Sequence, residues 1–542
     1  MTPFGPRRWE TVWIVLLLLS VVIVAAGVVV PLVDGDALFF GEIAKGILRS
    51  GDWVTLHHRL SPSWVVDKPP LTFWLMALVF RITGPTGPAL HIWQLPLSLV
   101  LLAATYHLAR LSSPGPAGRE EGALAALLLG TSLLGFYQAL SPQQDVALTL
   151  FLTLGFVAYL RYRTGGETGA ALMAGFWIAA AVLSKGLVAL AVFGLVVTGD
   201  LLIPSKAAGH WRWPQVAVGA AVFAVIGAPW FVVEGLRHGR PFVDAFFISG
   251  IGVGRFFRPA LSAPLPYWQA LLAYVPMLII WAFPWTGLLP RAAAEAWRLV
   301  RTGPRPLRLS ALWAGLSFLL LSVSPGDKVF RYLFPLLPSL CVLLARVMIK
   351  AMDDVRAMRA VAVTTAGIAV PVFAAAAWLM ASRFPEARSI YAPILVPFLS
   401  VLTVSVVVFA FLGWRGSGRV AVAALCVGIL VAYGVLEWAV ATRWEALWPW
   451  RTAAATINNL YRPGDRVVIR VRHGAEANPL AYWLDRPIQL AADDAAVERL
   501  WHDGRLFGFL SSESFANLRH RLRLAVLLEF PAGWVLITNE AP

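Results

Sequence analysis

The sequence predicts an all-α polytopic membrane domain followed by a small C-terminal α/β domain, and three observations support this fold class. Hydrophobic residues make up 58% of the 542 residues and charged residues only 14%, with a mean hydropathy of +0.70. That composition is too apolar for a water-soluble protein of this length. Long apolar segments recur up to residue 440, and the composition becomes more polar after it. We therefore expect a transmembrane domain over 1–440 and an extracytoplasmic domain over 441–542.

The number of membrane spans follows from the apolar segments and from the charges between them. Apolar segments lie near 12–32, 69–83, 90–110, 121–140, 145–160, 168–183, 186–203, 214–233, 266–288, 308–323, 332–349, 360–381, 391–413 and 419–440. The second has only about 15 residues, which is short for a crossing. Leaving it out gives about 13 spans and places every short basic loop on the side of Arg7 and Arg8, as the positive-inside rule expects.

Composition also argues against several other classes of protein. The net charge of +15 would suggest nucleic-acid binding in a soluble protein, but here it fits basic loops that face the cytoplasm and contact anionic lipid. Cys341 and Cys426 both lie in apolar segments, so neither a disulfide framework nor a thiolate metal site is expected. The first apolar segment is too long for the core of a cleaved signal peptide, and we expect it to be retained.

The predicted topology gathers ionisable residues from distant parts of the chain on the outer face of the membrane. The loop 34–68 carries Asp34 and Asp36 at its start and Asp67 and Lys68 at its end. Asp145 and Lys185 begin and end apolar segments on the same face. Charges at such a boundary are costly to desolvate and suggest a site. Taken alone, however, Asp145 could be a helix N-cap and Lys68 a snorkelling lysine.

Two further groups of residues are predicted to be on this face. Lys328 and Arg331 lie within four residues of each other at the end of a span, followed by Tyr332, and two such cations suit a phosphate group. The segment 234–265 carries Arg237, Arg240, Arg255 and Arg258 among aromatic residues. For each of these arginines except Arg255, an amphipathic helix on lipid headgroups is the alternative. Glu42 lies in a short amphipathic segment expected at the interface.

Several short motifs occur in order over roughly residues 10–350. They are Asp34-Gly35-Asp36 with Gly41-Glu42-Ile43-Ala44 and Gly51-Asp52-Trp53, Lys68-Pro69-Pro70-Leu71 with Trp74, Asp145 with Leu148-Thr149-Leu150, Leu183-Ser184-Lys185-Gly186, Pro229-Trp230, Arg255-Phe256, Pro284-Trp285, and Lys328 with Arg331-Tyr332 and Pro335. Each motif is weak alone, but their order and spacing resemble the GT-C-type glycosyltransferases that use lipid-linked sugars. The resemblance is to the branch of the aminoarabinose transferases and the dolichyl-phosphate-mannose-protein mannosyltransferases.

The resemblance implies a reaction and assigns roles to the candidate residues. Such an enzyme moves a sugar from a polyprenyl phosphate, such as undecaprenyl phosphate, to a lipid or protein acceptor outside the cytoplasmic (inner) membrane. Asp36 would be the base, or would orient the acceptor or a divalent ion, and Asp145 would be the second carboxylate. The phosphate ligands would be Lys68, Lys185 and Arg255, with Lys328 and Arg331 as weaker candidates; Asp34, Glu42, Asp67 and Tyr332 would support them.

The sequence departs from the lipid A branch of that family at several positions. Ala37 follows Asp36 where an acidic residue is usual, Phe39 stands where a basic residue is common, and Asp67 replaces a usual Glu. The stretch before Arg255 lacks the expected His or acidic residue. The metal requirement, the sugar and the acceptor therefore stay open, with aminoarabinose transfer to lipid A of the lipopolysaccharide as one case.

The last hundred residues are predicted to contain both strands and helices. Strands are expected at 467–471, 524–528 and 534–537 and helices at 478–484 and 494–501. A transporter or flippase for a lipid-linked substrate is the alternative, although the two halves of the chain show neither an internal repeat nor paired broken spans. A non-catalytic scaffold would not need two carboxylates and several cations on one face. Membrane lipids are expected partners, and nucleic acid is not.

Overall fold

The structure is a computed structural model, and it describes residues 6–28, 35–60, 68–113, 115–203, 209–248, 266–382, 385–471, 474–531 and 533–540. Asp34, Asp67 and Arg255 lie outside the described residues, as does the segment 234–265 beyond residue 248.

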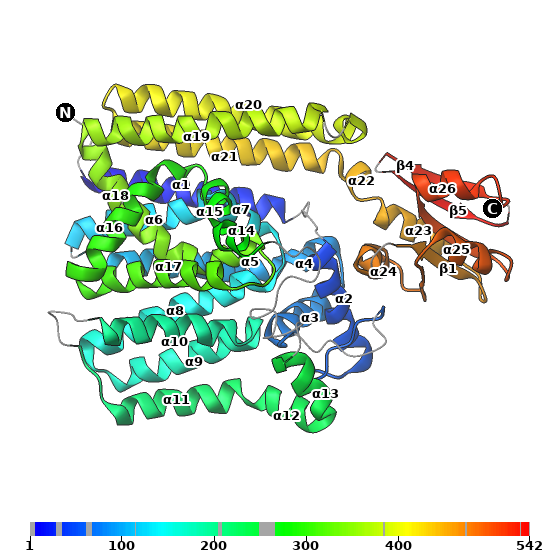
Figure 1. Ribbon diagram of the computed structural model, residues 1–542, viewed down its shortest axis with the longest axis horizontal. Coiled ribbons are helices and arrows are strands. Elements are labelled where there is room, and N and C mark those ends of the chain that lie inside the picture. Colours follow the sequence, from blue (N-terminus) through cyan, green and yellow to red (C-terminus); the bar gives the residue numbers. More distant parts are fainter. Residues whose placement is uncertain are drawn as a thin grey trace.

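Long helices that lie side by side form most of the molecule (Figure 1). Within the described ranges, nine helical stretches are long and apolar enough to cross a membrane. They are α1 (Pro6–Gly27), α4 with α5 (Gly87–Ile92, Gln94–Arg110), α8 (Gln144–Gly165), α9 (Thr168–Lys185), α17 (Arg305–Val323), η4 with α18 (Phe330–Leu336, Leu337–Asp353), α19 (Val355–Ser382), α20 (Pro385–Trp414) and α21 (Gly418–Ala441).

Two further candidate spans are bent pairs of helices. The bend is 66° between α6 (Gly115–Thr131) and α7 (Leu133–Leu140), and 43° between α11 (Trp213–Gly227) and α12 (Pro229–His238). Ser132 starts α7 anew, because its hydroxyl accepts a hydrogen bond from the backbone N–H of Gly135 at 3.0 Å. At the second bend Pro229 removes a backbone donor.

The number of spans can be compared with the predicted thirteen. The bent pairs raise the number among the described residues to eleven, and three shorter apolar helices remain, namely α3 (Leu71–Thr83), α10 (Val188–Leu202) and α14 with α15 (Tyr267–Leu272, Tyr274–Trp281). The predicted thirteen spans lie between this total of eleven and the total that is reached when all three shorter helices are added. The short segment that the charge pattern leaves out corresponds to α3.

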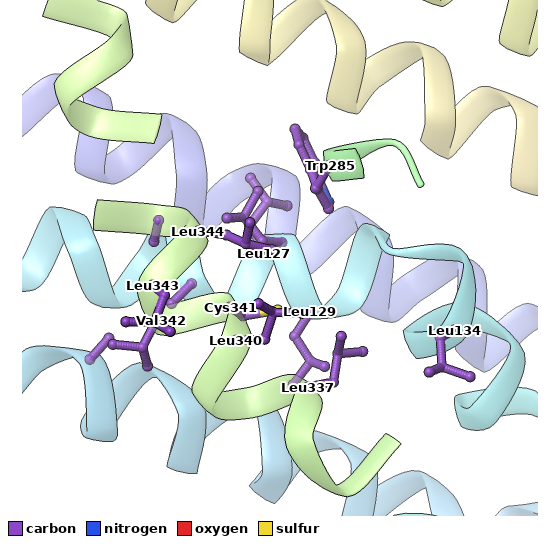
Figure 2. Packing of buried hydrophobic residues seen from close by; sticks show 14 of the residues in the cluster. Leu127, Leu129, Leu134, Trp285, Leu337, Leu340, Cys341, Val342, Leu343 and Leu344 are labelled. Atoms are coloured by element: carbon purple, nitrogen blue, oxygen red, sulfur yellow. The ribbon is translucent and has the colours of Figure 1, made fainter. Parts of the chain in front are cut away.

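The core of the membrane domain is built from helices that are apolar on nearly every face. Leu127 and Leu129 of α6 are at most 2% exposed, and they lie beside Leu340, Cys341 and Leu344 of α18 (Figure 2). Helices that are apolar all round need neighbours on every side or lipid. The remaining helices of this domain are short: α2 (Gly35–Ser50), α13 (Arg240–Val243), η1 (Asp244–Ile248), η3 (Trp285–Leu288) and α16 (Leu289–Thr302).

The C-terminal domain contains a five-stranded mixed sheet in the order β2-β1-β3-β5-β4. β1 (Arg466–Arg470) pairs in parallel with β2 (Gln489–Ala491) and β3 (Leu506–Ser511), while β5 (Trp534–Thr538) is antiparallel to β3 and β4 (Ala525–Phe530). Val468 opposes Gly508, and Leu510 opposes Val535. The helices are α22 (Trp444–Leu447), α23 (Trp450–Leu460), η5 (Gly474–Ala477), α24 (Asn478–Trp483), α25 (Asp494–Trp501) and α26 (Ser512–Leu518).

This arrangement agrees with the predicted fold class, an all-α membrane domain with a small α/β domain. The three predicted strands correspond to β1, β4 and β5, and the two predicted helices to α24 and α25. The prediction did not include β2, β3 or α26. In Figure 1 the α/β domain lies at one end of the bundle, beside α2, α3 and α4, with α12 and α13 at the same end.

Candidate active site

The first component of the site is an ion pair between the start of α2 and the start of η4. Asp36 is in the first turn of α2, where the helix dipole favours a carboxylate. Its Oδ2 lies 2.8 Å from Nη2 of Arg331, although the two residues are far apart in the sequence. The Asp36 side chain is 48% exposed and that of Arg331 23%. A substrate hydroxyl could therefore reach the Asp36 carboxylate.

The second component joins two neighbouring antiparallel helices. Asp145 is in the first turn of α8, and Lys185 is the last residue of α9, where Gly186 at φ +89° ends the helix. The Lys185 ammonium donates a hydrogen bond to Oδ1 of Asp145. The Asp145 side chain is only 2% exposed, so its charge is available to Lys185 rather than to solvent. Lys185 thus has an anionic partner within the chain.

Tyr332 lies between these two ion pairs. The centre of its ring is 4.9 Å from Nζ of Lys185 and 6.0 Å from Cζ of Arg331. The Lys68 ammonium lies 5.9 Å from the rings of Phe39 and Phe40, on α2. The charges of Arg331 and Lys68 both repel that of Lys185. Lys185 is therefore repelled by two neighbouring cations, and an anion bound among the three would relieve that repulsion.

Lys328 is directed elsewhere. Its ammonium donates hydrogen bonds to the carbonyl oxygens of Leu321 at 2.8 Å and Ser322 at 3.1 Å, and also to that of Ser324, at the C-terminal end of α17. Burial lowers the pKa of Lys328 to about 8. In this geometry Lys328 caps a helix, and its predicted role as a phosphate ligand has no contact in support of it.

Glu42, predicted as a supporting residue, is the centre of a separate charged cluster. Its side chain is fully buried, 2.5 Å from Nη2 of Arg49, 3.4 Å from Nε of Arg59 and 3.9 Å from Nζ of Lys45. Lys45 also donates to Oδ1 of Asp485 in the C-terminal domain at 2.8 Å.

Arg59 makes a second connection between the two domains. It donates to the carbonyl oxygens of Ala481 and, at 2.5 Å, of Leu484. The helix that begins with Gly35 and Asp36 is therefore fastened to the C-terminal domain. Sequence reasoning missed Arg59 and Asp485, since only their contacts reveal their role.

The tryptophan motifs converge on the loop that follows α2. The indole N–H of Trp74 donates to the carbonyl oxygen of Trp53 at 2.5 Å, and that of Trp230 to the carbonyl oxygen of Val54 at 2.9 Å. Arg237 lies 3.0 Å from Asp52 in the same loop. Three distant motifs thus share one task, which is to hold the chain that leads from α2 toward Lys68.

No group of three or more His, Cys, Asp or Glu side chains that could hold a metal ion is found in the described parts of the chain. Asp34 and Asp67 lie outside those parts.

The fold and the site together define a class: a polytopic membrane protein whose α/β domain adjoins a cluster of carboxylates and cations at one end of the helix bundle. A solved structure with a similar fold is that of ArnT from Cupriavidus metallidurans. Its crystal structure with bound undecaprenyl phosphate superposes with a TM-score of 0.78 at 19% sequence identity, over 99% of both chains. The crystal structure of the apo state gives 0.75 at 20% identity over 98% of both chains.

Sequence relatives agree with the fold. The family model for dolichyl-phosphate-mannose-protein mannosyltransferase matches residues 67–232. The undecaprenyl phosphate-alpha-4-amino-4-deoxy-L-arabinose arabinosyl transferase of Aeromonas hydrophila is 26% identical over 320 residues, which is 58% of this chain and 56% of the relative. The transferase of the same name from Pseudomonas aeruginosa is 27% identical over 360 residues, 64% of this chain and 61% of the relative.

These comparisons confirm the family resemblance that the motifs indicated, and they confirm the predicted fold class. The chain spans only about 56% of the length of the first of these relatives. The residues matched by the family model include Lys68, Asp145 and Lys185.

Proposed function

We propose that this protein is a membrane glycosyltransferase that moves a sugar from a polyprenyl phosphate donor to a lipid or protein acceptor. The observation that carries the proposal is the pair of carboxylate–cation contacts that share Tyr332. One of them, Asp36 with Arg331, is open to solvent, and the other, Asp145 with Lys185, is not. Sugar transfer from a lipid phosphate needs an accessible base and fixed positive charge, and this geometry provides both.

The roles follow from the chemistry of the reaction. The acceptor oxygen forms a bond to the anomeric carbon, while the bond from that carbon to the phosphate oxygen breaks. Positive charge develops at the anomeric carbon in the transition state, as in glycoside hydrolysis. Asp36 takes the proton of the acceptor hydroxyl. The polyprenyl phosphate leaves with a larger negative charge, which Lys185, Lys68 and Arg331 stabilise.

Asp145 is assigned a positioning role within this proposal. It is almost fully buried, and Lys185 lies directly on it, so a substrate hydroxyl has no path to its oxygens. It would hold the Lys185 ammonium in place and keep it charged. Arg255 is proposed as a further phosphate ligand on the strength of its motif alone.

The donor and acceptor are proposed from the named relatives. The ArnT crystal structure contains undecaprenyl phosphate, and the curated relatives are aminoarabinose transferases, which makes undecaprenyl phosphate the proposed carrier and aminoarabinose the first sugar to test. A lipid such as lipid A is the first acceptor to test. The active site and the α/β domain are proposed to face the extracytoplasmic side of the inner membrane, because that orientation leaves the basic loops in the cytoplasm.

The decisive experiment compares envelope lipids and glycans by mass spectrometry in wild type, a deletion strain and a strain with Asp36→Asn. We expect the same sugar to disappear from the same acceptor in both mutants, with the Asp36→Asn protein present at its normal level. The proposal fails if the Asp36→Asn strain keeps the modification that the deletion strain loses. A transporter would instead show uptake of a lipid-linked substrate into vesicles without any transfer of sugar.

A further inference from the structure

A second buried charged cluster lies at the opposite end of the bundle from the candidate active site. Asp145 begins α8, whereas Arg163 is in its last turn. Eighteen residues of α-helix separate them, which corresponds to about 27 Å. The cluster also takes Asp200 from α10, and Arg305 and Arg308 from the start of α17. Arg163, Asp200, Arg305 and Arg308 do not belong to the site described above.

Asp200 is the centre of this cluster. Its carboxylate accepts a hydrogen bond from the Tyr159 hydroxyl at 2.9 Å and another from Nη2 of Arg308. Nη2 of Arg163 lies 3.6 Å from it, and Nε of Arg305 lies 4.0 Å from it. All four charged residues are buried, with exposures of 2% for Asp200, 5% for Arg163, 7% for Arg305 and 1% for Arg308.

The charges of the cluster do not balance. Three guanidinium groups surround one carboxylate, and each buried charge is costly without a counter-charge. In the described part of the chain, Nε and Nη1 of Arg163 have no hydrogen-bond partner, although the residue is only 5% exposed. A guanidinium always carries its charge and its five donors, so these two atoms indicate an acceptor that the described residues do not supply.

An apolar cavity adjoins Arg163. It lies between α8, α9, α10 and α11 and has a volume of about 230 Å³. Its lining is apolar and aromatic and includes Tyr159, Ala174, Phe193 and Trp211. The guanidinium of Arg163 lies 5.5 Å from the ring of Trp211 and 5.8 Å from that of Tyr159, so the charge borders the cavity.

We propose that this cavity and the arginine cluster bind one anionic phospholipid, with an acyl chain in the cavity and the phosphate against Arg163. Free phosphate would use the arginines but would leave the apolar cavity without a function, and a neutral lipid would leave the charge unbalanced. The lipid comes from the leaflet opposite the candidate active site, which is the cytoplasmic leaflet in the topology that the basic loops favour. The site is independent of the proposed transfer reaction.

The test is lipid binding by the purified full-length protein in a neutral detergent. Dioleoyl phosphatidylglycerol is added to the wild type, and the midpoint of thermal unfolding is followed against lipid concentration, with dioleoyl phosphatidylcholine and inorganic phosphate as the comparison ligands. We expect phosphatidylglycerol alone to raise the midpoint, and native mass spectrometry to find one retained phosphatidylglycerol per chain. Arg163→Gln should weaken the apparent affinity at least about tenfold, since it removes one charged phosphate contact.

Matched variants separate this site from general lipid effects. Arg161→Gln removes an arginine from the same helix whose side chain is exposed beside His107, and it should change the affinity less than about twofold. Ala174→Phe should fill the cavity and abolish binding, whereas Met173→Phe, at an exposed position of the same helix, should not.

Several results would overturn the proposal. One is equal affinity for phosphatidylglycerol in the wild type and Arg163→Gln. Another is an effect of inorganic phosphate as large as that of the lipid. If Arg163→Gln does not fold, unchanged phosphatidylglycerol binding by Ala174→Phe, or a wild type that retains no lipid, would be sufficient.

Discussion

Nη2 of Arg331 lies 2.8 Å from Oδ2 of Asp36, and this contact places the proposed base next to a proposed phosphate ligand. The ion pair is partly exposed, so its intrinsic strength is modest. Its importance lies in position, because Asp36 begins α2 and Arg331 begins the turn that leads into α18. A bound phosphate would compete with Asp36 for Arg331, and the carboxylate would then be released to face the acceptor hydroxyl.

The first prediction concerns the competition between Asp36 and a bound phosphate for Arg331. Arg331→Gln should lower kcat for sugar transfer about 10- to 100-fold, because one cation that stabilises the leaving phosphate is lost. Arg331→Lys should recover part of that loss, since it keeps the charge but not the two-pronged geometry. The measurement is transfer of labelled sugar by purified protein in detergent. Equal activity of Arg331→Gln and the wild type would contradict the assignment.

The second prediction concerns Lys185 and Asp145. Lys185→Met and Asp145→Asn should each reduce transfer strongly. Lys185→Met removes a phosphate ligand, and Asp145→Asn removes the carboxylate that holds the Lys185 ammonium in place. Because the two groups act as one unit, the double variant should lose little more than Lys185→Met alone. Rate and binding of polyprenyl phosphate should be measured in all four proteins. Losses that simply multiply would show that Asp145 has a task of its own, such as a second base.

The third prediction concerns the connection between α2 and the α/β domain. Asp485→Asn removes the charge that binds Lys45 and should make cleavage at the connection near residues 441–449 faster by limited proteolysis, with a smaller loss of transfer. Asp503→Asn is the matched control: the Asp503 side chain is 75% exposed, close to the 73% of Asp485, but it pairs with Arg466 inside the domain. Equal protease resistance of the two variants would argue against the connection.

The structure also indicates what the sequence could and could not predict. Apolar length and loop charge predicted the membrane domain, because both are one-dimensional properties of the chain. Asp36, Asp145, Lys185 and Tyr332 were predicted from their motifs, and the structure brings all four together. The structure also places Lys68 beside Phe39 of α2, and its role as a phosphate ligand stays a prediction.

Other parts of the prediction depended on contacts that have no signature in the sequence. Lys328 resembles a phosphate ligand in the sequence, yet its ammonium is used by carbonyl groups of its own turn. The cluster around Glu42 depends on Asp485, which is more than 400 residues away. β3 has a glycine in the middle of an apolar run, and its place at the centre of the sheet follows only from its pairing with β1 and β5.

The last prediction is a pH dependence that originates at His58. His58 is 4% exposed and stacks on the ring of Phe39 at 4.5 Å. Burial, together with the charges of Arg59 and Arg49, lowers the pKa of His58 from its ordinary value of 6.5 to about 4. Between these two pH values the unfolded chain binds a proton that the folded chain does not, so the free energy of unfolding falls as the pH falls from 6.5 through 4. Above pH 6.5 this residue contributes no slope.

His58→Asn lacks that titration, so its stability should depend less on pH in this window than that of the wild type. Between pH 7.5 and 4 the midpoint of thermal unfolding should therefore fall more for the wild type than for the variant. His57→Asn is the control, because the neighbouring His57 is exposed and should keep the wild-type slope. Parallel curves for the wild type and His58→Asn would mean that folding does not change the pKa of His58, which would contradict the expected effect of its burial.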